Sequence, residues 1–457
     1  MSSSVSSACS LMASTRNSSP PAEPAARVAA CLERHVRQGE RLVAALSGGI
    51  DSVVLLHLLH DLSRHHGFQL SAVHVNHGLS PHADDWQAFC RRLCLSLGVP
   101  LAVAHVEVQD VAAAGLEAAA RQARYAAFEG VDADWLVLAH QRDDQAETLL
   151  FNLLRGAGLA GAAAMPVVRG FPGRPGPRIL RPLLGASRAD VERYADERHL
   201  AWIEDESNLD VRHARNFLRR SILPQLRERF PGCDAALARA AAHFAEGDAL
   251  LSQLAEIDAR TALREGRILV AELGRLDEAR ARNLLRHVLK RAGVAMPDSA
   301  RLQEAVRQVC HAAADRQLGI DLGQCLLHRY RGELWLTPKP YASVAINWHG
   351  EDTLAWGHGT LRFDRTRDDG ICIARLQGKA VRILPRQGGE RFRPDARRPR
   401  RELKKLLQEN GVPPWQRERL PLLWCGEELV WVPGIGIDCA WQCRKGEAGL
   451  LPVWMQQ

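Results

Sequence analysis

Residues 47–52 combine two adjacent glycines with two hydroxyl groups and one carboxylate. The glycines let the backbone reach positive φ and approach a ligand closely, and N–H groups that open a helix attract anions. The segment therefore suits phosphate, although no lysine follows as in the G-x-x-x-x-G-K-[ST] loop. Asp51 would repel a phosphate unless a divalent cation lay between them, so we expect it to bind Mg²⁺. The predicted phosphate-binding residues are Ser47, Gly48, Gly49, Ile50, Asp51 and Ser52.

The sequence on either side places this segment in a strand-to-helix turn. Residues 42–46 are a short apolar run typical of a buried strand, and leucines at helical spacing follow the turn. Strand-like runs at 70–75, 101–106 and 135–139 then alternate with helix-like segments. This pattern predicts an α/β fold with a doubly wound parallel sheet. Ligands of such sheets bind beyond the carboxyl ends of the strands.

Polar residues stand at the ends of the second and fourth predicted strands. His74 opens the run H-V-N-H-G-L-S, which is either a polar loop with incidental histidines or a wall around the adenosine end of a nucleotide. After the fourth strand, His140 is followed by Asp143, Asp144 and Glu147. Helix capping explains only one of these carboxylates, so the cluster suits a Mg²⁺ ion or a cationic substrate.

A helix-like segment between these runs carries Arg121 and Arg124, which project from the same side because they are three residues apart. Arg121 either pairs with Glu117 at the surface, or both guanidiniums neutralise phosphate charge or hold an RNA backbone. Another basic stretch, which contains Arg215, follows an acidic run at 204–206. These two stretches can form a solvated network of ion pairs.

Length and composition indicate a globular protein of two or three domains. The 457 residues exceed one compact core, and the chain is 46% hydrophobic and 25% charged. Lys and Arg outnumber Asp and Glu by 60 to 53, which favours an anionic partner. No apolar run reaches the length of about 18 residues that a transmembrane helix needs. Eleven cysteines without a C-x-x-C pair fit a reducing cytoplasm, and we expect Cys90 and Cys94 in the core.

The remaining segments suggest a domain order. The first 24 residues hold nine serines and three prolines, which predicts a disordered leader. Helix-like runs at 234–263 and 276–292 precede strand-like residues 317–336. Between residues 386 and 405, nine Arg or Lys stand against three acids. This basic segment is either a solvated surface or a site that binds a phosphate backbone.

Six blocks of the first half resemble the bacterial tRNA(Ile)-lysidine synthetases, a family of the PP-loop ATP pyrophosphatase superfamily. The blocks lie in order between residues 47 and 208: S-G-G-I-D-S, H-V-N-H-G-L-S, E-A-A-A-R-x-A-R-Y, H-x-x-D-D-Q-A-E-T, L-L-R-G-A-G-L and W-I-E-D-E-S-N. Near the carboxyl end, K-K-L-L-Q-E-N-G-V-P-P-W is similar to the tRNA-binding domain of the same family.

This resemblance implies an ATP-dependent carbon–nitrogen ligase that acts in the cytoplasm. In the family, ATP adenylates the wobble cytidine of tRNA(Ile) with a CAU anticodon, and pyrophosphate leaves. Free L-lysine then displaces AMP at carbon 2 to form lysidine, so that the tRNA reads AUA instead of AUG and carries Ile instead of Met. ATP and Mg²⁺ are the implied cofactors, and a second copy of the chain is a candidate partner.

The resemblance also implies domains and roles for particular residues. A PP-loop catalytic domain is expected over 25–231, a small helical α+β substrate-binding domain over 232–340, and an α+β tRNA-binding domain over 375–457. His74 and residues 47–52 would bind ATP, and Asp51 would also bind the metal. The expected catalytic residues are Asp51, Arg121, Arg124, Asp144, Glu147 and Arg215.

Three other functions remain as alternatives. A PP-loop enzyme that thiolates tRNA would need cysteines at cluster-binding spacing, and the sequence has none. A non-catalytic tRNA-binding protein would not need the intact residues 47–52. A small-molecule amidotransferase of the superfamily would not explain the basic segment.

Overall fold

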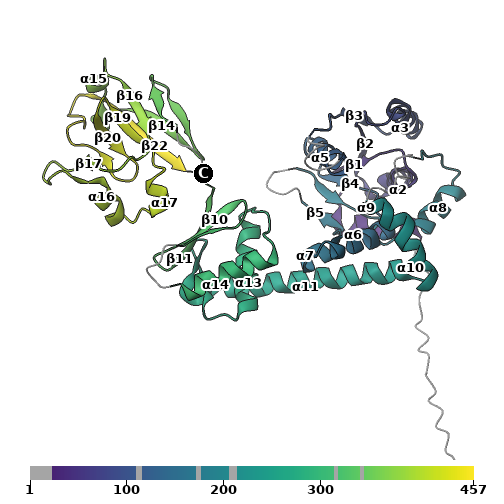
Figure 1. Ribbon diagram of the computed structural model, residues 1–457. Coiled ribbons are helices and arrows are strands. Elements are labelled where there is room, and N and C mark those ends of the chain that lie inside the picture. The colour runs from purple at the N-terminus through teal and green to yellow at the C-terminus, as the bar shows by residue number, and fades with distance from the viewer. Residues whose placement is uncertain are drawn as a thin grey trace, which may run out of the picture. The chain divides into compact units, whose positions relative to one another are not determined.

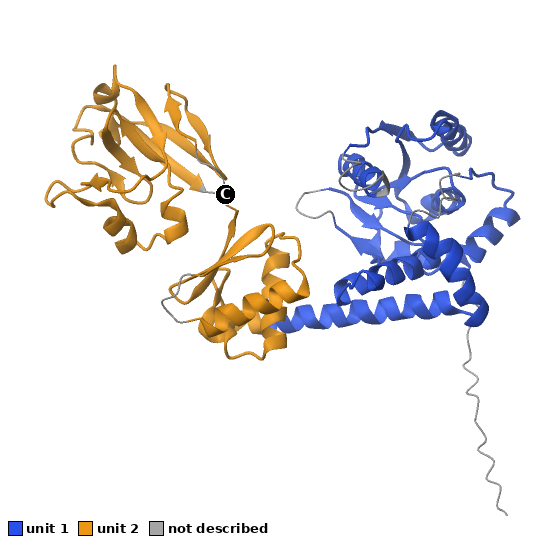
Figure 2. Cartoon of the chain, in the orientation of Figure 1, with its two compact units in different colours: residues 1–257 blue, residues 258–457 orange. Residues whose placement is uncertain are grey.

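The computed structural model describes residues 23–109, 116–170, 176–204, 214–312, 318–339 and 344–456. The chain divides into two compact units, Met1–Ile257 and Asp258–Gln457 (Figure 2). All but the last two residues of the predicted leader lie outside the described residues. Among the described helices, none has the length and apolar character that crossing a membrane requires.

The first unit alternates strands with helices (Figure 1). Its elements are α1 (Pro24–His35), β1 (Arg41–Ala45), α2 (Ile50–His66), β2 (Gln69–Asn76), α3 (Ala83–Leu97), β3 (Leu101–His105), α5 (Leu116–Glu129), β4 (Trp135–Val137), α6 (Arg142–Leu154), α7 (Leu159–Ala162), β5 (Val168–Arg169), β6 (Arg178–Leu180), α8 (Arg188–Glu197), α9 (Ala214–Phe217), the π-helix η2 (Leu218–Ile222), α10 (Leu223–Arg229) and most of α11 (Cys233–Ala262).

The sheet of this unit has the strand order β3-β2-β1-β4-β6-β5. All neighbours are parallel except β5, which pairs antiparallel with β6 at the edge. The prediction of a doubly wound parallel sheet is confirmed, and the short antiparallel edge strand was not predicted. Strand order reverses between β1 and β4, so the crevice expected to hold a ligand opens at their carboxyl ends.

Helices cover both faces of this sheet, so its strands are apolar on both sides. Leu42 and Ala44 face a core made with α1, α2, α3 and α8. Val43 faces the opposite core, to which α5 contributes Phe128. Cys90 and Cys94 of α3 are buried in the first core, as predicted.

The second unit begins inside α11 and combines short helices with antiparallel sheets. Its helices are α12 (Val270–Leu273), α13 (Glu278–Arg291), α14 (Ser299–His311), α15 (Ile373–Leu376), α16 (Leu403–Glu409) and α17 (Pro414–Arg417). Its strands are β7 (Leu263–Arg264), β8 (Arg267–Leu269), β9 (Leu318–Asp321), β10 (Cys325–Tyr330), β11 (Glu333–Pro338), β12 (Ile346–Trp348), β13 (Thr353–Trp356), β14 (Gly359–Arg367), β15 (Ile371–Cys372), β16 (Val381–Leu384), β17 (Arg391–Phe392), β18 (Arg401–Glu402), β19 (Leu422–Cys425), β20 (Glu428–Val432), β21 (Gly436–Ile437) and β22 (Ala448–Gln456).

The described residues of this unit form the sheets β7-β8-β11-β10-β9, β12-β16-β19-β20-β21, β13-β14-β22-β15 and β17-β18. Arg331 and Gly332 form the turn that joins β10 to β11, and both residues have positive φ. The short helix α16 begins inside the basic segment of residues 386–405. Strand β14 pairs along its whole length with β22, so the last sheets include residues before 375, the expected start of the final domain.

Candidate active site

The turn between β1 and α2 is closed by the hydroxyl of Ser52. This oxygen accepts hydrogen bonds from the backbone N–H groups of Ser47 and Gly48, both at 3.2 Å, and donates to the carbonyl of Gly49 at 2.8 Å. The Ser47 hydroxyl lies 3.1 Å from the same oxygen. Backbone donors and hydroxyls thus converge at the start of α2, whose positive dipole end favours an anion.

Gly48 must be glycine for two reasons. Its φ of +92° is disfavoured for residues with a side chain, and an added Cβ would lie 2.7 Å from Cδ1 of Ile203. Ile203 also donates its N–H to the Gly48 carbonyl at 2.9 Å. The segment after α8 therefore packs directly on the phosphate-binding turn.

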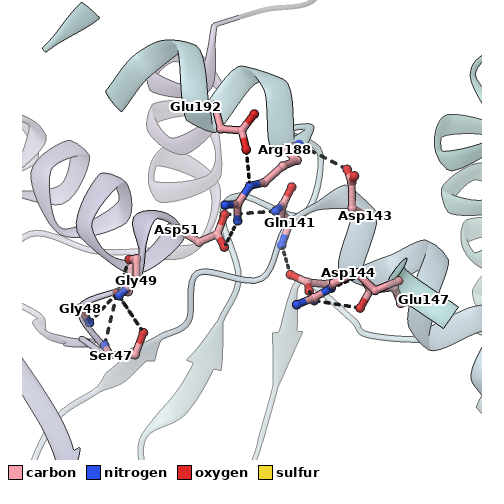
Figure 3. Close-up of polar contacts among 12 residues, drawn as sticks. Ser47, Gly48, Gly49, Asp51, Gln141, Asp143, Asp144, Glu147, Arg188 and Glu192 are labelled. Carbon is pink, nitrogen blue, oxygen red and sulfur yellow. Dashed lines mark hydrogen bonds and ion pairs between the residues drawn. The ribbon is translucent and has the colours of Figure 1, made fainter. Parts of the chain in front are cut away.

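Asp51, in the first turn of α2, is held from two sides (Figure 3). Its Oδ2 accepts a hydrogen bond from Arg188 at 2.9 Å, and its Oδ1 accepts one from the Gln141 amide at 3.1 Å. Burial raises the pKa of Asp51 to about 6; Arg188 opposes this shift and Asp144 adds to it. A carboxylate that is costly to keep ionised has a strong preference for a cation nearby.

The three carboxylates at the start of α6 are paired with arginines from later in the chain. Arg219 of η2 donates to both oxygens of Glu147, at 2.6 and 2.9 Å, and to Asp144 at 3.1 Å. Arg227 of α10 donates to Asp143 at 2.7 Å. Glu147 is only 3% exposed, and burial raises its pKa although Arg219 opposes the shift.

A cavity of about 250 Å³ lies between the phosphate-binding turn and α5. This volume is below the roughly 300–1,000 Å³ of pockets that hold a whole drug-sized ligand. The predicted site residues that line it are Ser47, Gly49, Asp51, Ser52, Arg121, Arg124 and Asp144. The structure thus brings together residues from three separate sequence blocks.

Two histidines of this cavity were not among the predicted site residues. Burial lowers the pKa of His140 to about 3, helped by Arg181, which donates to its Nδ1 at 3.3 Å. His77 also lines the cavity, and its buried Nδ1 has no hydrogen-bond partner among the described residues. Both lie within blocks noted in the sequence, H-V-N-H-G-L-S and H-x-x-D-D-Q-A-E-T, but the sequence alone does not indicate which histidine faces the cavity.

His74 is placed differently from His77. It is 4% exposed, and its Nδ1 lies 2.9 Å from the carbonyl of Leu46, the residue before the phosphate-binding turn. It does not belong to the cavity lining. The geometry therefore gives His74 the role of holding the end of β1.

The predicted arginines fall on two sides of the site. Arg121 donates to the Tyr125 hydroxyl at 3.4 Å, its guanidinium lies over that ring, and both residues line the cavity. Arg215 donates to Thr148 of α6 at 2.7 Å. The side chain of Glu117 and residues 205–213 lie outside the described residues, so the predicted Glu117–Arg121 pair is not described.

The residues around Asp51 fit a magnesium ion that is held mainly by phosphate oxygens. Mg²⁺ usually takes one or two protein carboxylates and completes its shell with phosphates and water. Asp51 and Asp144 line the same cavity, and the buried Oε1 of Gln141 has no partner among the described residues. No group of three or more metal-ligating side chains occurs in the described parts of the chain. A cage made of protein ligands alone is therefore not formed by these residues.

The basic segment of the second unit presents several arginines to solvent. Arg397 and Arg398 are exposed, with Arg398 at 3.8 Å from Asp395. Arg400 pairs with Asp438 at 3.3 Å, and Arg401 pairs with Glu409. Exposed guanidiniums held on a folded surface are suited to contact phosphates.

Comparison with known proteins identifies three matching family models along the chain. Residues 22–226 match a PP-loop domain, residues 269–335 a TilS substrate binding domain, and residues 381–454 a TilS substrate C-terminal domain. The tRNA(Ile)-lysidine synthase of Nitrosomonas europaea is 44% identical over 428 residues, which cover 93% of each chain. That of Aromatoleum aromaticum is 47% identical over 421 residues, 91% of this chain and 98% of its own. A U34-tRNA thiolase structure from Methanococcus maripaludis covers 49% of this chain and 78% of its own, at 18% identity and a TM-score of 0.42.

Proposed function

The chain belongs to the tRNA(Ile)-lysidine synthase family, and from this we propose that it joins L-lysine to carbon 2 of the wobble cytidine of tRNA(Ile) with a CAU anticodon. The observation that carries the proposal is the likeness over 91–93% of the chain to relatives of that name. The PP-loop domain implies that ATP drives the reaction. ATP and tRNA are therefore its substrates, together with lysine.

The phosphate-binding turn would hold the pyrophosphate part of ATP. The N–H groups of Ser47 and Gly48, which now bond to the Ser52 hydroxyl, are the donors that a phosphate oxygen would take over. Magnesium, when bound, neutralises phosphate charge, and Asp51 would hold it with Asp144 nearby. Arg121 and Arg124, on the opposite side of the cavity, would stabilise the negative charge that develops at the α-phosphate.

In the first step, the oxygen on carbon 2 of the cytidine attacks the α-phosphorus, and pyrophosphate leaves. The lysine amine then attacks carbon 2, and AMP leaves with the oxygen. A single-stranded anticodon loop suits this chemistry because its base can leave the stack at low cost. The protein contributes position and charge stabilisation.

We propose that Asp144 and Glu147 bind the ammonium groups of lysine. Free lysine carries two such groups and must lose a proton from one of them to attack. In the structure, the guanidinium of Arg219 fills this position and bonds to both carboxylates. Lysine would then compete with Arg219 for the acids. Arg215, which contacts α6 through Thr148, is proposed to act on the same side.

The proposal extends to the partners and the setting of the reaction. The basic segment would bind the tRNA backbone, and the cytoplasm supplies tRNA, ATP and lysine together. Assembly as a homodimer stays a prediction. A tRNA thiolase is not favoured, because no three metal-ligating side chains gather among the described residues to hold a cluster, and the relatives carry a different name.

The decisive experiment incubates the protein with ATP, lysine and a CAU-anticodon tRNA(Ile), and then measures the masses of the digested nucleosides. We expect a cytidine whose mass is increased by one lysine minus one water. The matched control is a tRNA(Ile) whose wobble base is guanosine. A mass gain that matches replacement of one oxygen by sulfur, or no mass gain from an enzyme that binds both ATP and the tRNA, would contradict the proposal.

A further inference from the structure

Two buried carboxylates shape the basic segment, although the segment itself is rich in arginine. Glu390 is 7% exposed and accepts the N–H groups of Gln387 and Gly388, at 2.6 and 2.7 Å. Asp438 is 1% exposed and lies far along the chain, after β21. Buried acids are rare unless they are paired and hydrogen-bonded, so their partners show what they hold in place.

Asp438 ties the middle of the segment to the end of β21. Its Oδ2 accepts the N–H of Arg393 at 3.0 Å and the guanidinium of Arg400 at 3.3 Å. Its Oδ1 accepts the N–H of Ala440 at 3.1 Å. Arg393 is thus held through its backbone, and Arg400 through its side chain.

Neighbouring hydrogen bonds that do not involve the Asp438 carboxylate reinforce this attachment. The carbonyl of Arg393 accepts the N–H of Cys439 at 2.8 Å. The Gln442 amide donates to the carbonyl of Pro394 at 3.0 Å. The chain between Arg393 and Arg400 is therefore fixed at both ends, and the exposed Arg397 and Arg398 lie inside the fixed loop.

We propose that Asp438 is a positioning residue for tRNA binding, which holds residues 393–400 in the conformation that presents their guanidiniums to phosphates. The inference rests on the proposed function, because it assumes that the basic segment binds tRNA. Charge alone predicts that Asp438 weakens tRNA binding, since an acid close to the arginines repels the phosphate backbone. Preorganisation lowers the entropy lost when the loop binds, and so raises affinity.

The two explanations differ in the sign of one measurement. Asp438→Asn should weaken the binding of tRNA by roughly tenfold, the size of effect that loss of a charged hydrogen bond produces. The matched control is Glu402→Gln, which removes the same charge from the basic segment at a carboxylate that is 57% exposed. Glu402→Gln should bind tRNA as tightly as the wild type or more tightly. Asp438→Asn with unchanged or tighter binding would overturn the proposal.

Two further readouts separate positioning from a general loss of structure. The apparent KM for tRNA should rise in Asp438→Asn while kcat at saturating tRNA and the KM for ATP stay unchanged. The loss caused by Arg400→Gln should be smaller in the Asp438→Asn background than in the wild type, because the two residues act together. Additive losses would show that Asp438 does not act through Arg400, and would reject the idea.

Two more variants test the proposal if Asp438→Asn does not fold and test the basic segment separately. If Asp438→Asn does not fold, Gln442→Ala carries the test, since it removes the attachment to Pro394 without any charge change. Unchanged tRNA affinity in Gln442→Ala would then overturn the proposal. Replacing Arg397 and Arg398 by Gln tests the underlying function separately. If that double variant binds tRNA like the wild type, the basic segment is not the binding surface; if it binds more weakly while Asp438→Asn does not, only the role of Asp438 fails.

Discussion

Asp51 couples the proposed chemistry to the stability of the fold. Burial raises its pKa from 3.8 to about 6, so the folded protein binds this proton more tightly than the unfolded chain does. The free energy of unfolding therefore falls as pH rises through this interval, and the loss is complete above it. This difference in pKa between the folded and unfolded states corresponds to a loss of at most about 3 kcal/mol in the free energy of unfolding. The side chain is 29% exposed, and water reduces the cost of its charge.

The substitution Asp51→Asn removes this charge with little change of shape. We expect the variant to be more stable than the wild type at pH 8, by up to about 3 kcal/mol, and by roughly half as much at pH 5. Arg188 loses one partner but keeps Glu192 at 2.7 Å. The same variant should release no pyrophosphate from ATP, while its affinity for tRNA is retained.

The stability difference can be measured by hydrogen exchange of the α2 amides, with both proteins compared at the same pH. This readout reports on one domain and avoids treating the whole chain as a two-state system. A difference that does not change between pH 4 and pH 8, in a variant that folds, would refute the reasoning. Pyrophosphate release at the wild-type rate would remove Asp51 from the mechanism.

Asp190 provides a matched control because the same substitution should have the opposite pH dependence. Burial acts to raise its pKa, but hydrogen bonds from Ser187 and Arg193 prevail and lower it. Its stabilising effect is therefore present above the unfolded pKa and is lost as pH falls. Asp190→Asn should destabilise the fold at pH 7, and by less as the pH approaches 3.

Three further predictions concern the site and the tRNA surface. Glu147→Gln should still form adenylated tRNA but require roughly tenfold more lysine; absence of the adenylate, with ATP and tRNA bound, would assign Glu147 to the first step instead. Gly48→Ala should weaken ATP binding and destabilise the turn by about 1–3 kcal/mol, whereas Gly78→Ala, with positive φ but no atom within 4 Å, should leave ATP binding unchanged. Replacing Arg397 and Arg398 by Gln should weaken tRNA binding and reduce the number of counterions released on binding by about two, as measured from the salt dependence of the affinity. Equal salt slopes for the variant and the wild type would show that these arginines do not contact the tRNA.

Local signals in the sequence predicted the parts of the fold that depend on short-range pattern. The strand before residue 47 and the helix after it both follow from the spacing of apolar residues. The antiparallel edge strand β5 has only two residues and depends on pairing with β6. Such a strand leaves no periodic signal, so sequence could not predict it.

The same limit applies to the site. Sequence placed Asp51 and Asp144 near one another because both follow parallel strands of one sheet. It selected His74 for ATP, whereas the cavity lining includes His77, because which histidine turns inward depends on how the end of β2 meets the end of β1. Nor could it pair Arg219 with Glu147, since a separation of 72 positions along the chain gives no local constraint.

These ion pairs change the expected charge of the acidic cluster at the start of α6. Three carboxylates read from the sequence suggest a strongly negative pocket, whereas in the structure each has an arginine partner from η2 or α10. A site of this kind can receive an anion at its arginines together with a cation at its acids without leaving a buried charge unpaired. The reaction requires both, because the phosphate of the adenylate and the ammonium of lysine must be held at the same time. We therefore expect Arg219 to exchange Glu147 for a phosphate or adenylate oxygen as lysine enters, so that a change of partners, and not a change of net charge, separates the two steps.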